Sequence, residues 1–303
     1  MQKKKTTTVV GVLVLILITI FALVLWQGSG KKSDKKSNQL TIVTSTNVYA
    51  ELAKTVAGSH ADVSAVITKQ SVSPEDYEPT NSVAKKISKA DIVFGNGLGY
   101  DAWLKKLAKT SNTTQVLYTG DDILHAKAGS NPHLWNNPDN MIQAAQGLAD
   151  VLSQKDPKHK ADYQANAKAY AAKLKPVTEK IATLKAAVAG KEVMETEPVY
   201  EYMLEALGAN IVGGDFAESI EEGNDPSPAV LTDIQSKIKN HELAFLVYNT
   251  QTTGGTVDKI VKLAKDNNIP IVKVTETSPE NVSYVNWKLS ELNQIQKIVD
   301  KNK

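Results

Sequence analysis

The sequence contains no cysteine and no arginine. Without cysteine the chain cannot form disulfides, thiolate nucleophiles, cysteine-ligated zinc fingers or iron–sulfur clusters. All 35 basic residues are lysine, so the chain also lacks the planar, bidentate donor that proteins use for phosphate, carboxylate and guanine. We therefore expect no nucleic-acid partner.

The net charge of +2 hides an uneven distribution along the chain. Residues 1–39 carry seven lysines and one aspartate, a local charge of +6, while the other 264 residues carry 28 lysines against 32 acidic residues, a local charge of −4. Within the first stretch, residues 9–26 form an uncharged run of 18 residues. A secretory signal core usually has ~7–15 residues and a membrane span roughly 17–25.

The length of this apolar run predicts a single-pass membrane anchor. The lysines before it predict that its amino side faces the cytoplasm, which leaves the rest of the chain at the extracellular face of the cell membrane. Secretion after cleavage of a signal peptide is the alternative. Residues 27–39 are polar and predict a tether, so residues 1–39 form an anchor or signal segment plus tether.

From residue 40 onward, strand-like and helix-like segments alternate. Such alternation predicts βαβ units and mainly parallel sheets. The predicted strands of the first half are 40–46, 61–67, 91–97 and 114–120, and those of the second half are 191–197, 209–214, 242–249 and 270–276. The pattern predicts an α/β fold with two Rossmann-like lobes.

One long helix is predicted between the two halves. Asp156 and Pro157 make a good start and Gly190 a good stop, and apolar residues recur between them at steps of three, four and seven. About 33 residues would span roughly 50 Å, enough to run along two lobes. We predict an N-terminal lobe at 40–155, a connecting helix at 156–190 and a C-terminal lobe at 191–303.

Four loops after predicted strands carry a carboxylate or an imidazole beside a proline. Open α/β sheets bind ligands at the carboxyl ends of their strands, and proline stiffens a loop. The loops are 73–80, 130–135, 195–200 and 274–281. Each alone has an ordinary explanation, such as a helix cap, a solvated charge, or a histidine that satisfies a backbone group while Trp135 packs. Four loops in corresponding positions favour a metal site.

Several motifs in this order resemble the metal-binding lipoproteins of ABC importers for zinc and manganese, the cluster A-I (family 9) solute-binding proteins. The motifs are DYEPT, ADIVFGNGLGYDAWLKKL, NPHLWNNPDNM, TEPVYEYMLEALGA, DPSP and VTETSPE. The resemblance covers nearly all of residues 40–290. It implies two lobes bridged by a rigid helix, one divalent cation held between them by four side chains, and an ABC permease as partner. We expect a monomer.

The resemblance also implies which side chains hold the cation. His133 is the histidine of the PHxW motif, Glu197 lies five residues before a tyrosine, and Glu276 follows the final strand. Glu75 stands where the family usually has histidine in PHxYEP, and Asp76 is the alternative at this position. A second departure is the missing lipid-anchoring cysteine, which the transmembrane segment would replace.

The expected ligands are one imidazole and three carboxylates. Such an oxygen-rich set suits Mn²⁺ better than Zn²⁺, although zinc binds most sites more tightly, so selection must come from geometry and supply. We expect manganese first and zinc second.

The expected function is therefore capture of a divalent metal for delivery to a permease. A surface adhesin of the same fold is one alternative. A metal-dependent hydrolase is another, but the chain has neither HExxH nor GxSxG, and we expect no enzyme. The acidic residues Glu218, Glu221 and Glu222 are expected in a solvated acidic loop, and a place near the mouth of the cleft is the alternative.

Overall fold

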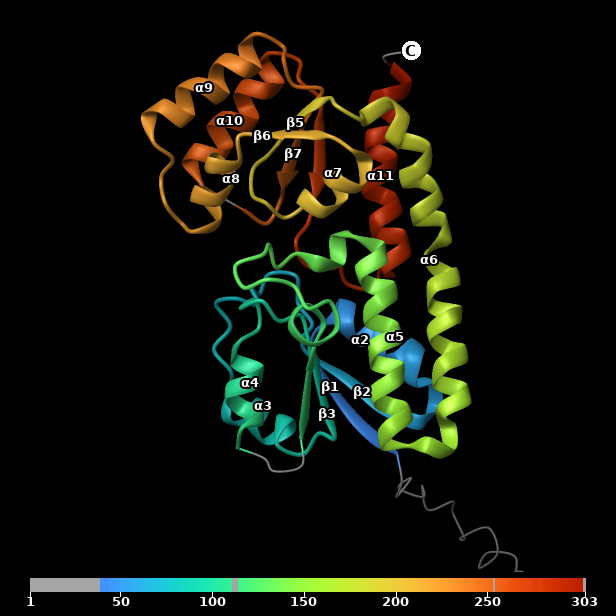
Figure 1. Ribbon diagram of the computed structural model, residues 1–303. Helices are drawn as coiled ribbons and strands as arrows, with labels where there is room; N and C mark the ends of the chain where they lie inside the picture. Colours follow the sequence, from blue (N-terminus) through green and yellow to red (C-terminus); the bar gives the residue numbers. More distant parts are fainter. Residues whose placement is uncertain (1–38, 111–113, 253, 302–303) are drawn as a thin grey trace, which may run out of the picture. The chain divides into compact units, whose positions relative to one another are not determined.

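Figure 1 shows the computed structural model of the chain, which describes residues 39–110, 114–252 and 254–301. The chain divides into two units, Met1–Gln39 and Leu40–Lys303, and all the elements below belong to the second unit. The predicted anchor at residues 9–26 lies outside the described residues. Among the helices that are described, none combines the length and the apolar character needed to cross a membrane.

The first sheet is parallel and has the strand order β2-β1-β3-β4. Its strands are β1 (Leu40–Thr46), β2 (Ala61–Ile67), β3 (Ile92–Gly95) and β4 (Gln115–Tyr118). Ile42 of β1 pairs with Val63 on one side and Ile92 on the other. Consecutive side chains point to opposite faces and both faces are covered, which is why most residues of β1, β3 and β4 are buried or half-buried on both faces, the threonines and serine of β1 included.

Different helices cover the two faces of this sheet. Ile42 faces a core with α2 (Asn47–Ala57), α5 (Pro138–Lys155) and the first half of the long helix, while Val43 faces α3 (Asn81–Ile87) and α4 (Trp103–Ala108). The short turns between these elements are η1 (Gly58–His60), η2 (Thr119–Ile123), η3 (Leu134–Asn136) and η4 (Pro157–His159).

The second sheet repeats this plan with the order β6-β5-β7-β8, again parallel. Its strands are β5 (Glu192–Glu195), β6 (Asn210–Val212), β7 (Phe245–Asn249) and β8 (Ile271–Val274). The helices α8 (Gly214–Glu221), α9 (Pro228–Lys239) and α10 (Gly255–Asp266) cover one face, and α7 (Glu201–Leu207) covers the other. The predicted α/β fold with two parallel sheets is confirmed.

The long helix α6 (Lys160–Val188) runs along both sheets (Figure 1). Its 29 residues span about 44 Å at ~1.5 Å per residue. The predicted apolar stripe is buried throughout and consists of Tyr163, Tyr170, Leu174, Val177, Ile181, Leu184 and Val188. The first three pack into the core of the first sheet and the last four into that of the second. The helix begins later than predicted, because Pro157 opens the separate turn η4.

The last helix, α11 (Tyr284–Lys301), packs beside α6 and also contacts both cores. Tyr284 and Trp287 belong to the first core, while Leu292 and Ile295 belong to the second. Two helices therefore cross from one lobe to the other. We propose 40–155 and 191–303 as the lobes and 156–190 as the connection.

A buried lysine on α11 lies between the lobes. Lys288 is 0% exposed, and its ammonium donates to Asn136 Oδ1 (2.6 Å) and Glu291 Oε2 (2.9 Å) and lies 3.4 Å from the centre of a Trp287 ring. The Asn136 amide in turn donates to the Val199 carbonyl (2.5 Å). These hydrogen bonds join η3 of the first lobe to α11 and to the loop after β5.

Lys288→Ala should destabilise the protein by about 3–5 kcal/mol, because it leaves the Glu291 carboxylate, 2% exposed, without its buried cation. Urea unfolding at neutral pH measures this difference. Lys297→Ala is the matched control, since Lys297 is exposed on the same helix. A loss for Lys288→Ala no larger than that of the control would contradict the role of the network.

Candidate metal-binding site

A cavity of about 740 Å³ lies between the two lobes, at the carboxyl ends of both sheets. Loops after β2, β5, β7 and β8 line it, together with the segment before η3. Among the described residues, the cavity is lined by six carboxylates, one imidazole and one lysine: Glu75, Asp76, Glu197, Glu221, Glu276, Glu280, His133 and Lys69. Such an excess of negative charge favours a cation.

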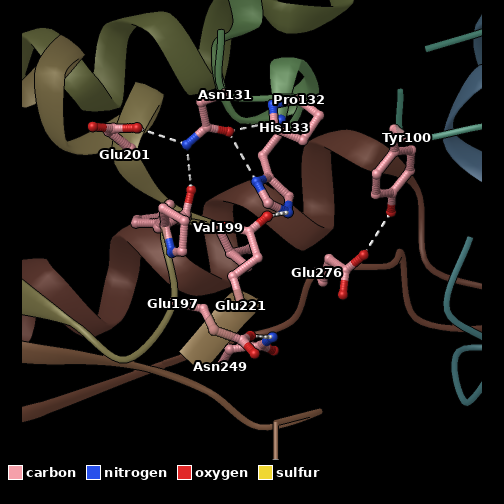
Figure 2. Close-up of polar contacts among 12 residues, drawn as sticks. Tyr100, Asn131, Pro132, His133, Glu197, Val199, Glu201, Glu221, Asn249 and Glu276 are labelled. Carbon is pink, nitrogen blue, oxygen red and sulfur yellow. Dashed lines mark hydrogen bonds and ion pairs between the residues drawn. The ribbon is translucent and has the colours of Figure 1, made fainter. Parts of the chain in front are cut away.

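His133 is the most rigidly held of the predicted ligands. Its side chain is buried, at 2% exposure, with its ring centre 5.4 Å from that of Trp135 and 6.0 Å from that of Tyr100. The Asn131 Oδ1 atom lies 2.9 Å from both the backbone nitrogen and the ring Nδ1 of His133. Figure 2 shows the other ring nitrogen, Nε2, facing the glutamates of the second lobe.

The hydrogen bonds of Asn131 decide which ring nitrogen of His133 carries the proton. The Asn131 amide donates to the Pro198 carbonyl and to Glu201 Oε2, both at 2.6 Å. The backbone N–H of His133 can only donate, so Asn131 Oδ1 is an acceptor and Nδ1 of the ring must donate to it. Nε2 is then left with its lone pair for a metal, the arrangement that a ligating histidine requires.

The charge state of His133 also suits a ligand. Burial, with a smaller contribution from the positive charge of Lys288, lowers the pKa of the imidazole to about 3. The ring is therefore neutral across the physiological range.

Glu197 is held by the loop that follows β7. Its Oε2 accepts hydrogen bonds from the Asn249 amide (2.6 Å) and from the Thr252 hydroxyl. These bonds fix one oxygen of the half-buried carboxylate and leave Oε1 for a ligand, as a preorganised site requires.

Glu276 is held by a residue of the opposite lobe. Tyr100, in the GNGLGY turn, donates its hydroxyl to Glu276 Oε1 at 2.7 Å. Burial raises the pKa of Glu276 to about 7, and the carboxylates of Glu197 and Glu75 add to this rise while the Tyr100 hydrogen bond opposes it. The bond joins the two lobes (Figure 2).

Glu75 lies in the exposed loop after β2. The loop is anchored next to it, because the Trp103 indole N–H donates to the Pro74 carbonyl at 3.0 Å and the ring of Trp103 packs against Tyr77. Desolvation by surrounding protein atoms raises the pKa of Glu75, and the charges of Asp76 and Glu197 raise it further. Asp76 is also exposed.

The four predicted ligands line one cavity but are not yet at bonding distance from a common point. Among the described residues, no group of three or more histidine, aspartate or glutamate side chains is close enough to hold a metal ion. Carboxylates repel one another, and a cation is needed to draw them together.

Glu221 also lines the cavity, although the sequence analysis did not include it among the expected ligands. Its Oε1 lies 4.0 Å from His133 Nε2, and its side chain is only 24% exposed. The expectation of a solvated loop is therefore wrong for Glu221, although Glu218 and Glu222 are exposed. Helical spacing could have placed Glu221 on the buried face of α8, because it lies four residues after the buried Ala217.

The family model described as ZnuA, zinc-uptake complex component A, periplasmic, matches residues 42–298. The iron ABC transporter substrate-binding lipoprotein MtsA of Streptococcus pyogenes is 27% identical over 284 residues, which cover 88% of each chain. The manganese ABC transporter substrate-binding lipoprotein PsaA of Streptococcus mitis is 27% identical over 310 residues, covering 94% of this chain and 97% of PsaA.

Solved structures share the fold. The substrate-binding protein FpvC of Pseudomonas aeruginosa, in complex with Mn²⁺, has a TM-score of 0.72 at 20% identity, covering 88% of this chain and 100% of FpvC. A cadmium-bound periplasmic metal-binding protein of Candidatus Liberibacter asiaticus has a TM-score of 0.69 at 16% identity, covering 86% of this chain and 100% of that protein.

These comparisons correct the predicted location. MtsA and PsaA are named as lipoproteins, which are held at a membrane by acyl chains and not by a spanning helix. No described helix of this chain can cross a membrane, and residues 9–26 lie outside the described residues. The prediction of a transmembrane anchor is wrong on these findings.

Asn131→Ala should remove the acceptor that fixes the His133 tautomer and weaken binding of a divalent metal by roughly 10–100-fold. The ¹⁵N chemical shifts of the imidazole report the tautomer, and calorimetry with Mn²⁺ reports the affinity. Asn224→Ala, in an exposed loop, is the control. Unchanged imidazole shifts in Asn131→Ala would show that this amide does not set the tautomer.

The raised pKa of Glu276, about 7 against 4.5 in an unfolded chain, makes the folded state bind a proton that the unfolded state has released. Stability of the metal-free protein should therefore fall as the pH rises from about 4.5 to about 7. Glu276→Gln cannot ionise and should reduce this fall. Urea unfolding of wild type and Glu276→Gln at several pH values measures this fall in stability. An equal pH dependence of the two proteins would count against the raised pKa of Glu276.

Proposed function

The chain belongs to the family of zinc-uptake complex component A, periplasmic, and we propose that the cation it captures is manganese in preference to zinc. It is a metal-binding, substrate-binding component of an ABC importer. The role of this family is to bind a cation for transport with a permease in the membrane and not to catalyse a reaction.

The observation that carries the proposal is the state of His133. A neutral imidazole with its free nitrogen directed at glutamates across a cavity is suited to a transition metal, which needs a nitrogen lone pair and anionic oxygens. We assign His133, Glu197, Glu276 and Glu75 as ligands, with Asp76 as the alternative to Glu75.

The preference for manganese rests on the chemistry of these donors. One nitrogen and three carboxylates form a hard, oxygen-rich set, whereas zinc sites are richer in nitrogen and sulfur. Relatives differ in the ion they are named for, iron for MtsA and manganese for PsaA, and the family description names zinc. Zn²⁺ is therefore the second candidate.

Capture begins with the electrostatic field of the cavity, whose carboxylates attract a divalent cation from solvent. His133 and Glu75 come from the first lobe, while Glu197 and Glu276 come from the second. A cation bound by all four removes their mutual repulsion and draws the two lobes together. The helices α6 and α11, which pack into both cores, limit this movement to a small adjustment.

His133→Ala and Glu197→Ala should each abolish the rise in melting temperature that Mn²⁺ produces in the wild-type protein, because a ligand that binds only the folded state stabilises it. Thermal unfolding of the full chain with and without metal measures the rise. His125→Ala, an exposed histidine, should keep it in full.

Retention of the full rise in both ligand variants would disprove the assignment of the ligands. Calorimetry of the wild-type protein with each ion tests the order of preference separately. Tight binding of Zn²⁺ with no binding of Mn²⁺ would reverse that order.

A further inference from the structure

The position of Glu221 at the end of α8 brings a further carboxylate to the cavity, beside those of Glu75, Glu197 and Glu276. The helix is packed against the core of the second lobe by Phe216 and Ala217. Glu221 continues this buried face toward the cavity, and Figure 2 shows its carboxylate directed at the ring of His133.

The contact between Glu221 and His133 is not a hydrogen bond. At 4.0 Å the distance from Oε1 to Nε2 is too long, and Nε2 carries no proton because Asn131 holds the proton on Nδ1. A carboxylate oxygen therefore faces the lone pair of a buried nitrogen. Two electron-rich atoms in this position lack a positive partner between them.

The separation of these two atoms suits ligands of one cation. With metal–ligand bonds of ~2.1 Å, two ligand atoms lie roughly 3 Å apart at a right angle and about 4.2 Å apart when opposite. The observed 4.0 Å falls within this range. A metal ion could thus bind both atoms with only a small movement of either side chain.

One lysine, Lys69, lines the same cavity as Glu221. Among the described residues, neither Lys69 nor any other lysine forms an ion pair with Glu221. Burial raises its pKa to about 8, and the charges of Glu75, Glu197 and Glu276 add to the rise, which shows that these four carboxylates share one field. The compensating charge must come from a bound cation or a proton.

We propose that Glu221 is a fifth ligand of the captured cation and that it favours Mn²⁺ over Zn²⁺. This inference rests on the proposed function. With Glu221 the protein supplies one nitrogen and four carboxylates, enough for five or more bonds. Manganese accepts such a number of oxygen ligands, whereas zinc in proteins is almost always four-coordinate in closed sites.

Calorimetry of the full chain with Mn²⁺ and, separately, with Zn²⁺ tests the proposal in wild type, Glu221→Gln and Glu218→Gln. Glu221→Gln keeps the size of the side chain and removes its charge. We expect its affinity for Mn²⁺ to fall at least tenfold and its affinity for Zn²⁺ to fall less. Glu218→Gln changes an exposed carboxylate on the same helix and should bind both ions as wild type does.

X-ray absorption at the manganese edge measures the number of ligand atoms around the bound ion. We expect about one light-atom ligand fewer in Glu221→Ala than in wild type. Melting temperatures without metal establish that each variant folds. If Glu221→Gln and Glu221→Ala bind Mn²⁺ as Glu218→Gln does, Glu221 is not a ligand. If affinity for both ions falls equally, the ligand role stands and the proposed preference is overturned.

Failure of the proposed function gives a different result. In that case neither wild type nor Glu218→Gln binds either ion. A wild type that binds Mn²⁺, beside a Glu221→Gln variant that binds it equally well, contradicts only the role of Glu221.

Discussion

Repulsion among the carboxylates that line the cavity is the constraint on which the metal site depends. Glutamates from both lobes face one cavity in which, among the described residues, a single lysine is the only basic side chain. Burial raises the pKa values of Glu75, Glu221 and Glu276, and the charges of the neighbouring carboxylates raise them further, so the charged forms are disfavoured until a cation is present. This crowding of carboxylates makes the site selective for positive charge. A divalent ion bound between the carboxylates of both lobes would relieve their repulsion.

Rigid parts of the fold surround these repelling groups. His133 is fixed by Asn131, which is itself bonded to the Pro198 carbonyl and Glu201 of the other lobe. Lys288 and its partners Asn136 and Glu291 add a buried polar network that joins the two lobes. A nitrogen ligand held this firmly can serve as the reference point for the more mobile carboxylates. Glu75, on an exposed loop, has the greatest freedom to adjust, which suits a position where the family usually has histidine.

Much of the fold was predictable because its signals are local. The strands of both sheets are apolar runs beside turn residues, and the stripe of α6 repeats at helical spacing, so residues 40–303 could be divided into elements before any contact was known. The start of α6 was misplaced, since a proline can open either a helix or a separate turn.

Glu221 and Asn131 were not identified as site residues in the sequence analysis for a different reason. An acidic residue near a helix end and an asparagine before a proline have the same local pattern whether they face solvent or a buried imidazole. The transmembrane location rested on the length of one apolar run and was corrected by the relatives.

The sequence by itself determined the parallel α/β architecture, the long connecting helix and four loops rich in metal donors, because these follow from periodicity and from the residue types beside each strand end. Only the tertiary structure decided which nitrogen of His133 is free, that Asn131 makes this choice, and that Glu221 faces it across the cavity. Those facts depend on burial and on contacts between residues far apart in the chain, such as Asn131 with Glu201 and Tyr100 with Glu276. Electrostatic and hydrogen-bond energies depend on the distances between groups, and these distances are fixed only when the chain has folded.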